Sequence, residues 1–96
     1  MVGTSLQMVD EFAEIMNLLG ETSRLKIVLY LWDKEASVSE IMTYLQMSQP
    51  LVSHHLKLLK EAHILKAVKQ GKKMIYGLVN SVVKDIVEVG LIGGQV

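Results

Sequence analysis

The sequence predicts a mainly α-helical fold with one β-hairpin, in the element order α-α-α-α-β-β-α. Two observations predict it. Apolar residues recur at three- and four-residue spacings through most of the chain, which is typical of amphipathic helices. The pattern changes once, where two short β-favouring runs flank the turn Gln70-Gly71-Lys72-Lys73. At 96 residues, the chain is expected to form a single domain over residues 1–96.

Two amphipathic helices are expected first, over residues 5–19 and 22–33, with Gly20 ending the first of them. The apolar stripe of the first helix consists of Val9, Phe12, Ala13, Met16 and Leu19. The stripe of the second helix consists of Leu25, Val28, Leu29 and Trp32.

The next two helices follow each other closely. Ser37 and Glu40 match the Ser-x-x-Glu capping box, which predicts that a third helix begins there and runs to about residue 46. Ser48 is expected to cap a fourth helix, whose first turn tolerates Pro50 because the amide hydrogens there have no helical partner. Because only two or three residues near Met47 connect the pair, residues 38–62 are predicted to form a helix-turn-helix.

Residues 64–79 are expected to form a hairpin from strands at 64–69 and 74–79, with Gly71 supplying a positive φ in its turn. Asn80 or Ser81 can then cap a last helix over residues 81–92. A hairpin, or wing, directly after a helix-turn-helix indicates a winged helix-turn-helix fold.

Positive charge is concentrated in one part of a chain whose net charge is zero. Residues 57–73 hold six lysines against Glu61, which gives +5. Residues 1–56 hold three basic and seven acidic side chains, which gives −4, and residues 74–96 hold −1. The +5 segment coincides with the fourth helix and the wing, which is typical of nucleic-acid binding. A solvated lysine face is the alternative.

The fourth helix and the wing supply the candidate DNA contacts. Glutamine and serine can hydrogen-bond base edges, so Gln49 and Ser53 are expected to read bases, with simple capping and solvation as the alternative. Ser48 can cap the helix, contact a phosphate, or do both. The remaining candidates are His54, Lys57, Lys60, Lys72 and Lys73. His55 is expected nearer the core as a hydrogen-bonded histidine, while Arg24 can contact phosphate or pair with Glu21 or Glu40.

The last helix is rich in β-branched residues, which have weak helix propensity, so it needs packing to persist. The first and last helices are therefore expected to form a two-fold dimer interface, although each could instead cover its own domain. The interface candidates are Val9, Phe12, Met16, Val82, Val83, Ile86 and Val87.

Several classes of protein are not expected. The chain has no cysteine, which excludes disulfides and thiolate metal sites. An enzyme is not expected, because no nucleophile–base spacing, glycine-rich phosphate loop or metal-ligand cluster occurs. The apolar runs are too short to span a membrane, and residues 1–19 do not read as a signal peptide, so no membrane partner and a cytoplasmic location are expected.

Four motifs, in order, carry a family resemblance: LGETSRLKIV at 19–28, ASVSEI at 36–41, LQMSQPLVSHHLKLLK at 45–60 and QGKKMIY at 70–76. Over about residues 10–80 the chain resembles the ArsR/SmtB family of small winged-helix repressors. The resemblance implies a homodimer that binds a pseudo-palindromic double-stranded operator. It places the fourth helix of each protomer in a major groove and the wing on the flanking minor groove, and it implies an inducer, here unknown, that weakens DNA binding.

The resemblance fails where relatives bind metals. The family's cysteine pair at the start of the third helix is replaced by residues 37–40, which hold no thiolate. The family's site between paired last helices falls near Asn80, Val82, Gly93 and Val96, of which three cannot ligate through a side chain. No metal or cofactor is therefore predicted. The alternative function is a winged-helix protein–protein interaction module with weak or lost DNA binding.

Overall fold

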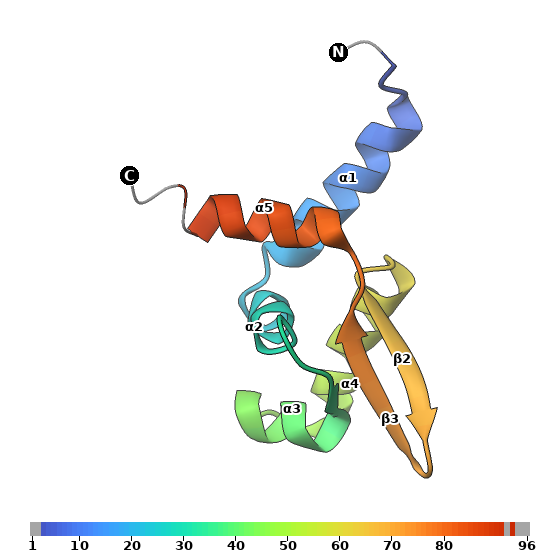
Figure 1. Ribbon diagram of the computed structural model, residues 1–96, viewed down its shortest axis with the longest axis vertical. Helices are drawn as coiled ribbons and strands as arrows, with labels where there is room; N and C mark the ends of the chain where they lie inside the picture. Colours follow the sequence, from blue (N-terminus) through green and yellow to red (C-terminus); the bar gives the residue numbers. More distant parts are fainter. Residues whose placement is uncertain (1–2, 92, 94–96) are drawn as a thin grey trace.

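The computed structural model describes residues 3–91 and 93 and has the predicted winged helix-turn-helix architecture (Figure 1). The observed elements are α1 (Leu6–Leu19), α2 (Thr22–Tyr30), β1 (Ala36–Ser37), α3 (Val38–Leu45), α4 (Gln49–Glu61), β2 (Leu65–Gln70), β3 (Lys73–Leu78) and α5 (Ser81–Leu91). The helices α2, α3 and α4 form the body, the hairpin lies along one side, and α1 and α5 cross at one end.

The first two helices begin and end through local hydrogen bonds. The Ser5 hydroxyl accepts from the Met8 amide at 3.1 Å to begin α1, and Gly20 ends that helix as predicted. The Glu21 carboxylate begins α2 by accepting the amides of Ser23 and Arg24, each at 3.0 Å. The second helix ends at Tyr30, three residues before the predicted end.

The inward face of α2 was predicted in part incorrectly. Val28 is buried, but its buried partners are Ile27 and Leu31, whereas Leu29 is exposed. Leu25 and Trp32 are only half-buried at the edge of the core. Apolar residues occupy more than one face of this helix, so periodicity alone could not decide which of these faces points into the core.

The helix-turn-helix is confirmed with its capping box. The Ser37 hydroxyl accepts from the Glu40 amide at 3.3 Å, and Glu40 Oε1 accepts from the Ser37 amide at 3.1 Å. The three residues 46–48 connect α3 to α4, and Gln46 takes a left-handed conformation with φ +55°. Pro50 lies in the first turn of α4, but the Ser48 side chain makes no capping hydrogen bond, so Ser48 is the N-cap by position only.

The wing contains one strand more than predicted. Strands β2 and β3 pair antiparallel from Leu65↔Leu78 to Gln70↔Lys73, each one residue from its expected position, and Gly71 at the turn has φ +63°. The two-residue strand β1 adds to the other edge of β3 and completes a sheet of order β1-β3-β2. A strand of two residues is too short to show periodicity, which is why the sequence did not predict it.

One apolar core joins all five helices to the sheet. Its buried residues are Leu18, Leu19, Ile27, Val28, Leu31, Ala36, Ile41, Val52, Leu56, Leu59, Ile64, Leu65, Val83 and Val87. Val83 and Val87 were predicted at a dimer interface. The structure corrects this, because both lie in the core of their own protomer and have almost no surface left for a second chain.

The last helix begins as predicted, at Asn80. The Asn80 Oδ1 atom accepts from the amides of Val82 at 3.0 Å and Val83 at 3.2 Å. The helix extends to Leu91, and residues 92 and 94, where its end was predicted, lie outside the described residues. Among the residues that the structure describes, no helix is long and apolar enough to cross a membrane.

Candidate nucleic-acid interface

The surface of α4 has a buried stripe and an exposed polar face. Its buried residues are Val52, His55, Leu56 and Leu59. At about 100° per residue, Pro50, His54 and Lys57 point away from that stripe. Gln49 and Ser53 lie on one flank of the exposed face and Leu51 on the other, and of these only Ser53 is half-buried. The first two turns of α4 therefore present a continuous, mostly polar surface.

Most of the candidate residues cluster at the N-terminal end of α4, and the two exceptions are Lys57 and Lys60. Ser48 is exposed, and its hydroxyl is free of a capping bond, so it is available for another acceptor or donor. Ser48, Gln49, Ser53 and His54 all lie within the first two turns. Lys60 lies about 16 Å further along the helix axis than Gln49, in the last turn, and so does not join this cluster.

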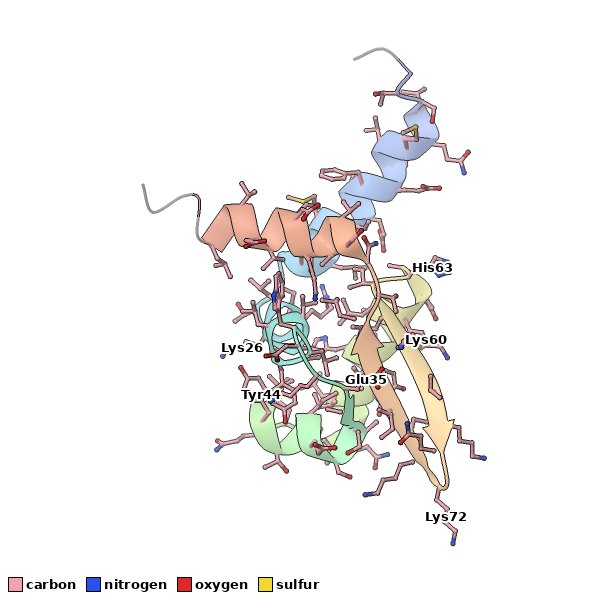
Figure 2. The ribbon with its side chains drawn as sticks, viewed as in Figure 1. Lys26, Glu35, Tyr44, Lys60, His63 and Lys72 are labelled. Carbon is pink, nitrogen blue, oxygen red and sulfur yellow. The ribbon has the colours of Figure 1, made fainter. Side chains whose placement is uncertain are left out.

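The wing presents a positive surface. The two-residue turn Gly71-Lys72 puts Lys72 at the tip of the hairpin, where its side chain extends away from the body (Figure 2). Lys73 begins β3 and is also exposed. Lys73 also lies near Glu40, where it adds to the lowering of the pKa of that carboxyl that hydrogen bonds from Ser37 chiefly cause.

Two other lysines of the +5 segment have acidic neighbours. Lys66 Nζ lies 3.1 Å from Glu35 Oε2, which ties the base of the wing to the loop before β1. Gly77 allows this pair, because a Cβ atom there would lie 2.8 Å from Glu35 Oε2. Lys57 Nζ is 4.0 Å from Glu61 Oε1, but both side chains are largely exposed, so that pair is weak.

Beneath α4, Arg24 connects three helices. Its Nε atom donates to the Leu18 carbonyl at the end of α1 at 2.9 Å, and one terminal nitrogen lies 4.0 Å from Glu21 Oε2. The same nitrogen lies 3.4 Å from His55 Nδ1 on α4. The Arg24 side chain is only 13% exposed. Of the alternatives that the sequence left open, the structure therefore favours pairing with Glu21 over contact with phosphate.

His55 is the buried, hydrogen-bonded histidine that was predicted. Burial lowers its pKa below the ordinary value of 6.5, with an opposing contribution from Glu21. Because a guanidinium only donates hydrogen bonds, His55 Nδ1 accepts from Arg24 and the ring is neutral. Glu21 Oε2 is 3.8 Å from His55 Nδ1, which is too far for a hydrogen bond. The pKa of Glu21 is lowered, chiefly because its carboxylate accepts a hydrogen bond from the backbone amide of Ser23.

Sequence reasoning did not identify Glu21, Arg24 and His55 as a unit. Arg24 and His55 are 31 positions apart, and no local pattern links them. The unit fixes one side of α4 to the junction of α1 and α2. These three residues therefore help to orient the polar face of α4, although they are not part of that face.

Exposed apolar side chains lie on α1 and α5. Val9, Phe12, Met16 and Val82 are each about half exposed. A shallow apolar groove between these helices is lined by Met16, Leu19, Gly20, Leu25, Ile86, Val87, Gly90 and Leu91. In Figure 1 the N-terminal part of α1 extends beyond the body, where no other element covers it. These surfaces are available to a second chain.

Within residues 3–91 and 93, no group of three or more His, Asp or Glu side chains is arranged to hold a metal ion. At Asn80, where the family resemblance would place a metal ligand, the side-chain oxygen already accepts two backbone amides. Val82 is an exposed valine, and Val96 lies outside the described residues.

Known proteins resemble this chain in sequence and in fold. Residues 21–67 match the model of the family described as bacterial regulatory protein, arsR family. An uncharacterized HTH-type transcriptional regulator of Methanocaldococcus jannaschii is 36% identical over 84 residues, which cover 86% of this chain and 94% of that protein. The HTH-type transcriptional repressor SmtB of Mycobacterium tuberculosis is 33% identical over 81 residues, which cover 84% of this chain but only 60% of that repressor.

A solved structure confirms the fold. The homodimeric winged helix-turn-helix DNA-binding domain from Mycobacterium bovis superposes with a TM-score of 0.85, and the alignment covers 99% of this chain and 91% of that one. The two sequences are 23% identical, so this likeness concerns the fold alone.

Proposed function

This chain belongs to the ArsR family of bacterial regulatory proteins, and from that premise we propose that it is a homodimeric repressor of transcription that binds a pseudo-palindromic DNA operator. One observation carries the proposal. The helix-turn-helix leaves one face of the first two turns of α4 exposed and mostly polar, beside a hairpin that ends in two exposed lysines. These are the two elements that a winged helix needs to read bases and to hold phosphates.

The polar face of α4 is proposed to enter the major groove. Gln49 can donate to and accept from adenine at N7 and N6, and Ser53 can donate or accept at a neighbouring base edge. His54 points outward from the same turns and Lys57 from the next turn, toward the groove or its edge. Ser48 and Lys60 are proposed to contact the phosphates on either side of the helix.

The wing is proposed to bind the DNA backbone beside the half-site. Lys72 at the tip and Lys73 next to it supply cations without a fixed donor–acceptor pattern, so they suit phosphates or the minor groove rather than base-specific contacts. Replacing both is therefore expected to weaken binding to all DNA about equally.

Dimerisation is proposed through α1 and α5. The residues that remain for the interface are Val9, Phe12, Met16, Val82 and Ile86, which have apolar surface outside the protomer core. A solvent-exposed apolar face on two crossing helices is best covered by an identical face related by two-fold symmetry. Two copies of α4 would then lie roughly 34–36 Å apart, one turn of DNA.

The proposal is tested by incubating the purified protein with sheared genomic DNA of its host and sequencing what it retains. An imperfect palindrome with half-sites one turn apart is expected. Gln49→Ala and Ser53→Ala should lose discrimination between operator variants more than total affinity. If a folded protein enriches no sequence at moderate salt, the protein–protein module becomes the better interpretation of the exposed apolar helices.

A further inference from the structure

Leu51 is an apolar side chain in the first turn of α4 that the protomer does not bury. It is 43% exposed, whereas Leu56 and Leu59 of the same helix are completely buried. It is the third residue of the helix, so its side chain is at the end that the helix-turn-helix presents outward. An exposed leucine at this position is not needed for the core.

Leu51 lies at the border between the polar face of α4 and its buried stripe. Residues three and four positions away share a helix side, so its neighbours are the exposed Ser48 and His54 and, toward the body, the half-buried Met47 and the buried His55. The exposed apolar residues of α1 and α5 lie at the other end of the body, because α4 begins next to α3 (Figure 1). The interface proposed for the dimer therefore does not account for Leu51.

We infer that Leu51 determines specificity by contacting the C5-methyl group of a thymine in each half-site. The inference rests on the proposed function, since it requires α4 to enter the major groove. In that groove thymine alone among the four bases presents a methyl group, and apolar side chains read it. Leu51 lies on the flank of α4 opposite Gln49 and Ser53, so its thymine belongs to a different base pair from those that Gln49 and Ser53 read.

Deoxyuridine isolates this contact, because it differs from thymidine only by the missing methyl group. Each thymine of the retained operator is replaced in turn, symmetrically in both half-sites, and the affinity of the wild-type dimer is measured. Removing one buried methyl group should weaken binding about fourfold per half-site, or about fifteenfold for both. One thymine position is expected to show this loss.

Leu51→Ala is then measured on the same series of DNAs. It should bind the thymine and deoxyuridine operators equally at that position, while Leu51→Met, which keeps an apolar side chain, should still distinguish them. Leu29→Ala is the matched control, because Leu29 is a similarly exposed leucine but lies on α2. It should keep the full thymine preference.

The outcomes separate this inference from the proposed function. If the wild-type protein binds a palindromic operator but tolerates deoxyuridine at every position, or if Leu51→Ala keeps the thymine preference, the role of Leu51 is refuted and the repressor stands. If no operator is retained at all, the proposed function fails and the role of Leu51 fails with it.

Discussion

The salt dependence of DNA binding tests the wing lysines directly. Each phosphate neutralised by the protein contributes about −0.9 to the slope of log affinity against log salt concentration. If Lys57, Lys60, Lys72 and Lys73 each neutralise one phosphate, a dimer neutralises eight, and the slope should be roughly −7. Replacing Lys72 and Lys73 with alanine removes four of these contacts per dimer and should reduce the slope to roughly −3.6.

This difference is large enough to measure by fluorescence anisotropy with a labelled operator. Between 50 and 200 mM salt the wild-type affinity should fall by about four powers of ten, and that of the double variant by about two. Lys66→Ala is the matched control on the same hairpin. Because Lys66 Nζ lies 3.1 Å from Glu35 Oε2, it is already paired, and its removal should change the slope by less than about one.

Two results would refute this reasoning. An unchanged slope in the double variant would mean that the wing tip does not contact phosphate. A reduction by Lys66→Ala as large as that by the double variant would mean that the wing acts through its total charge, and that the Glu35–Lys66 pair does not withhold a lysine from DNA.

Three further predictions concern stability and assembly. Burial lowers the pKa of His55, so below about pH 6.5 the unfolded chain binds a proton at this histidine that the folded chain does not bind. The contribution of His55 to the free energy of unfolding should therefore be constant above that pH. The free energy of unfolding should fall as the pH drops below it. Thermal unfolding between pH 7.5 and 5.5 should show a shallower decline for His55→Gln, and an equal decline would contradict the neutral, buried ring. Phe12→Asp should give monomers in sedimentation velocity. Tyr44→Asp, at an equally exposed aromatic residue on α3, should leave the dimer intact. If both variants are monomeric, the result would argue against an interface through α1. Ser37→Ala removes the hydroxyl that caps α3 and should lower stability by about 1 kcal/mol, a decrease in Tm of roughly 4–8 °C, and an unchanged Tm would show that the capping box is not needed.

Local patterns predicted most of the elements in this chain. The capping box at Ser37 and Glu40, the cap at Asn80 and the turn at Gly71 were all identified correctly, because each involves residues within a few positions of one another. The exposed polar side chains of α4 were identified for the same reason, since helical periodicity separates them from the buried stripe. Their contacts with DNA stay a prediction.

What the sequence determined by itself was therefore the order of elements, the helix-turn-helix and the positive wing, all of which follow from short-range hydrogen bonding and periodicity. Tertiary structure decided which apolar residues are buried in the protomer's own core. It placed Val83 and Val87 there, although their apolar side chains would have suited a dimer interface equally well. It also joined Arg24 to His55 across 31 positions and paired Lys66 with Glu35. Such contacts depend on where the chain returns in space, and so only the packed structure could specify which polar groups are paired and which remain free to bind a partner.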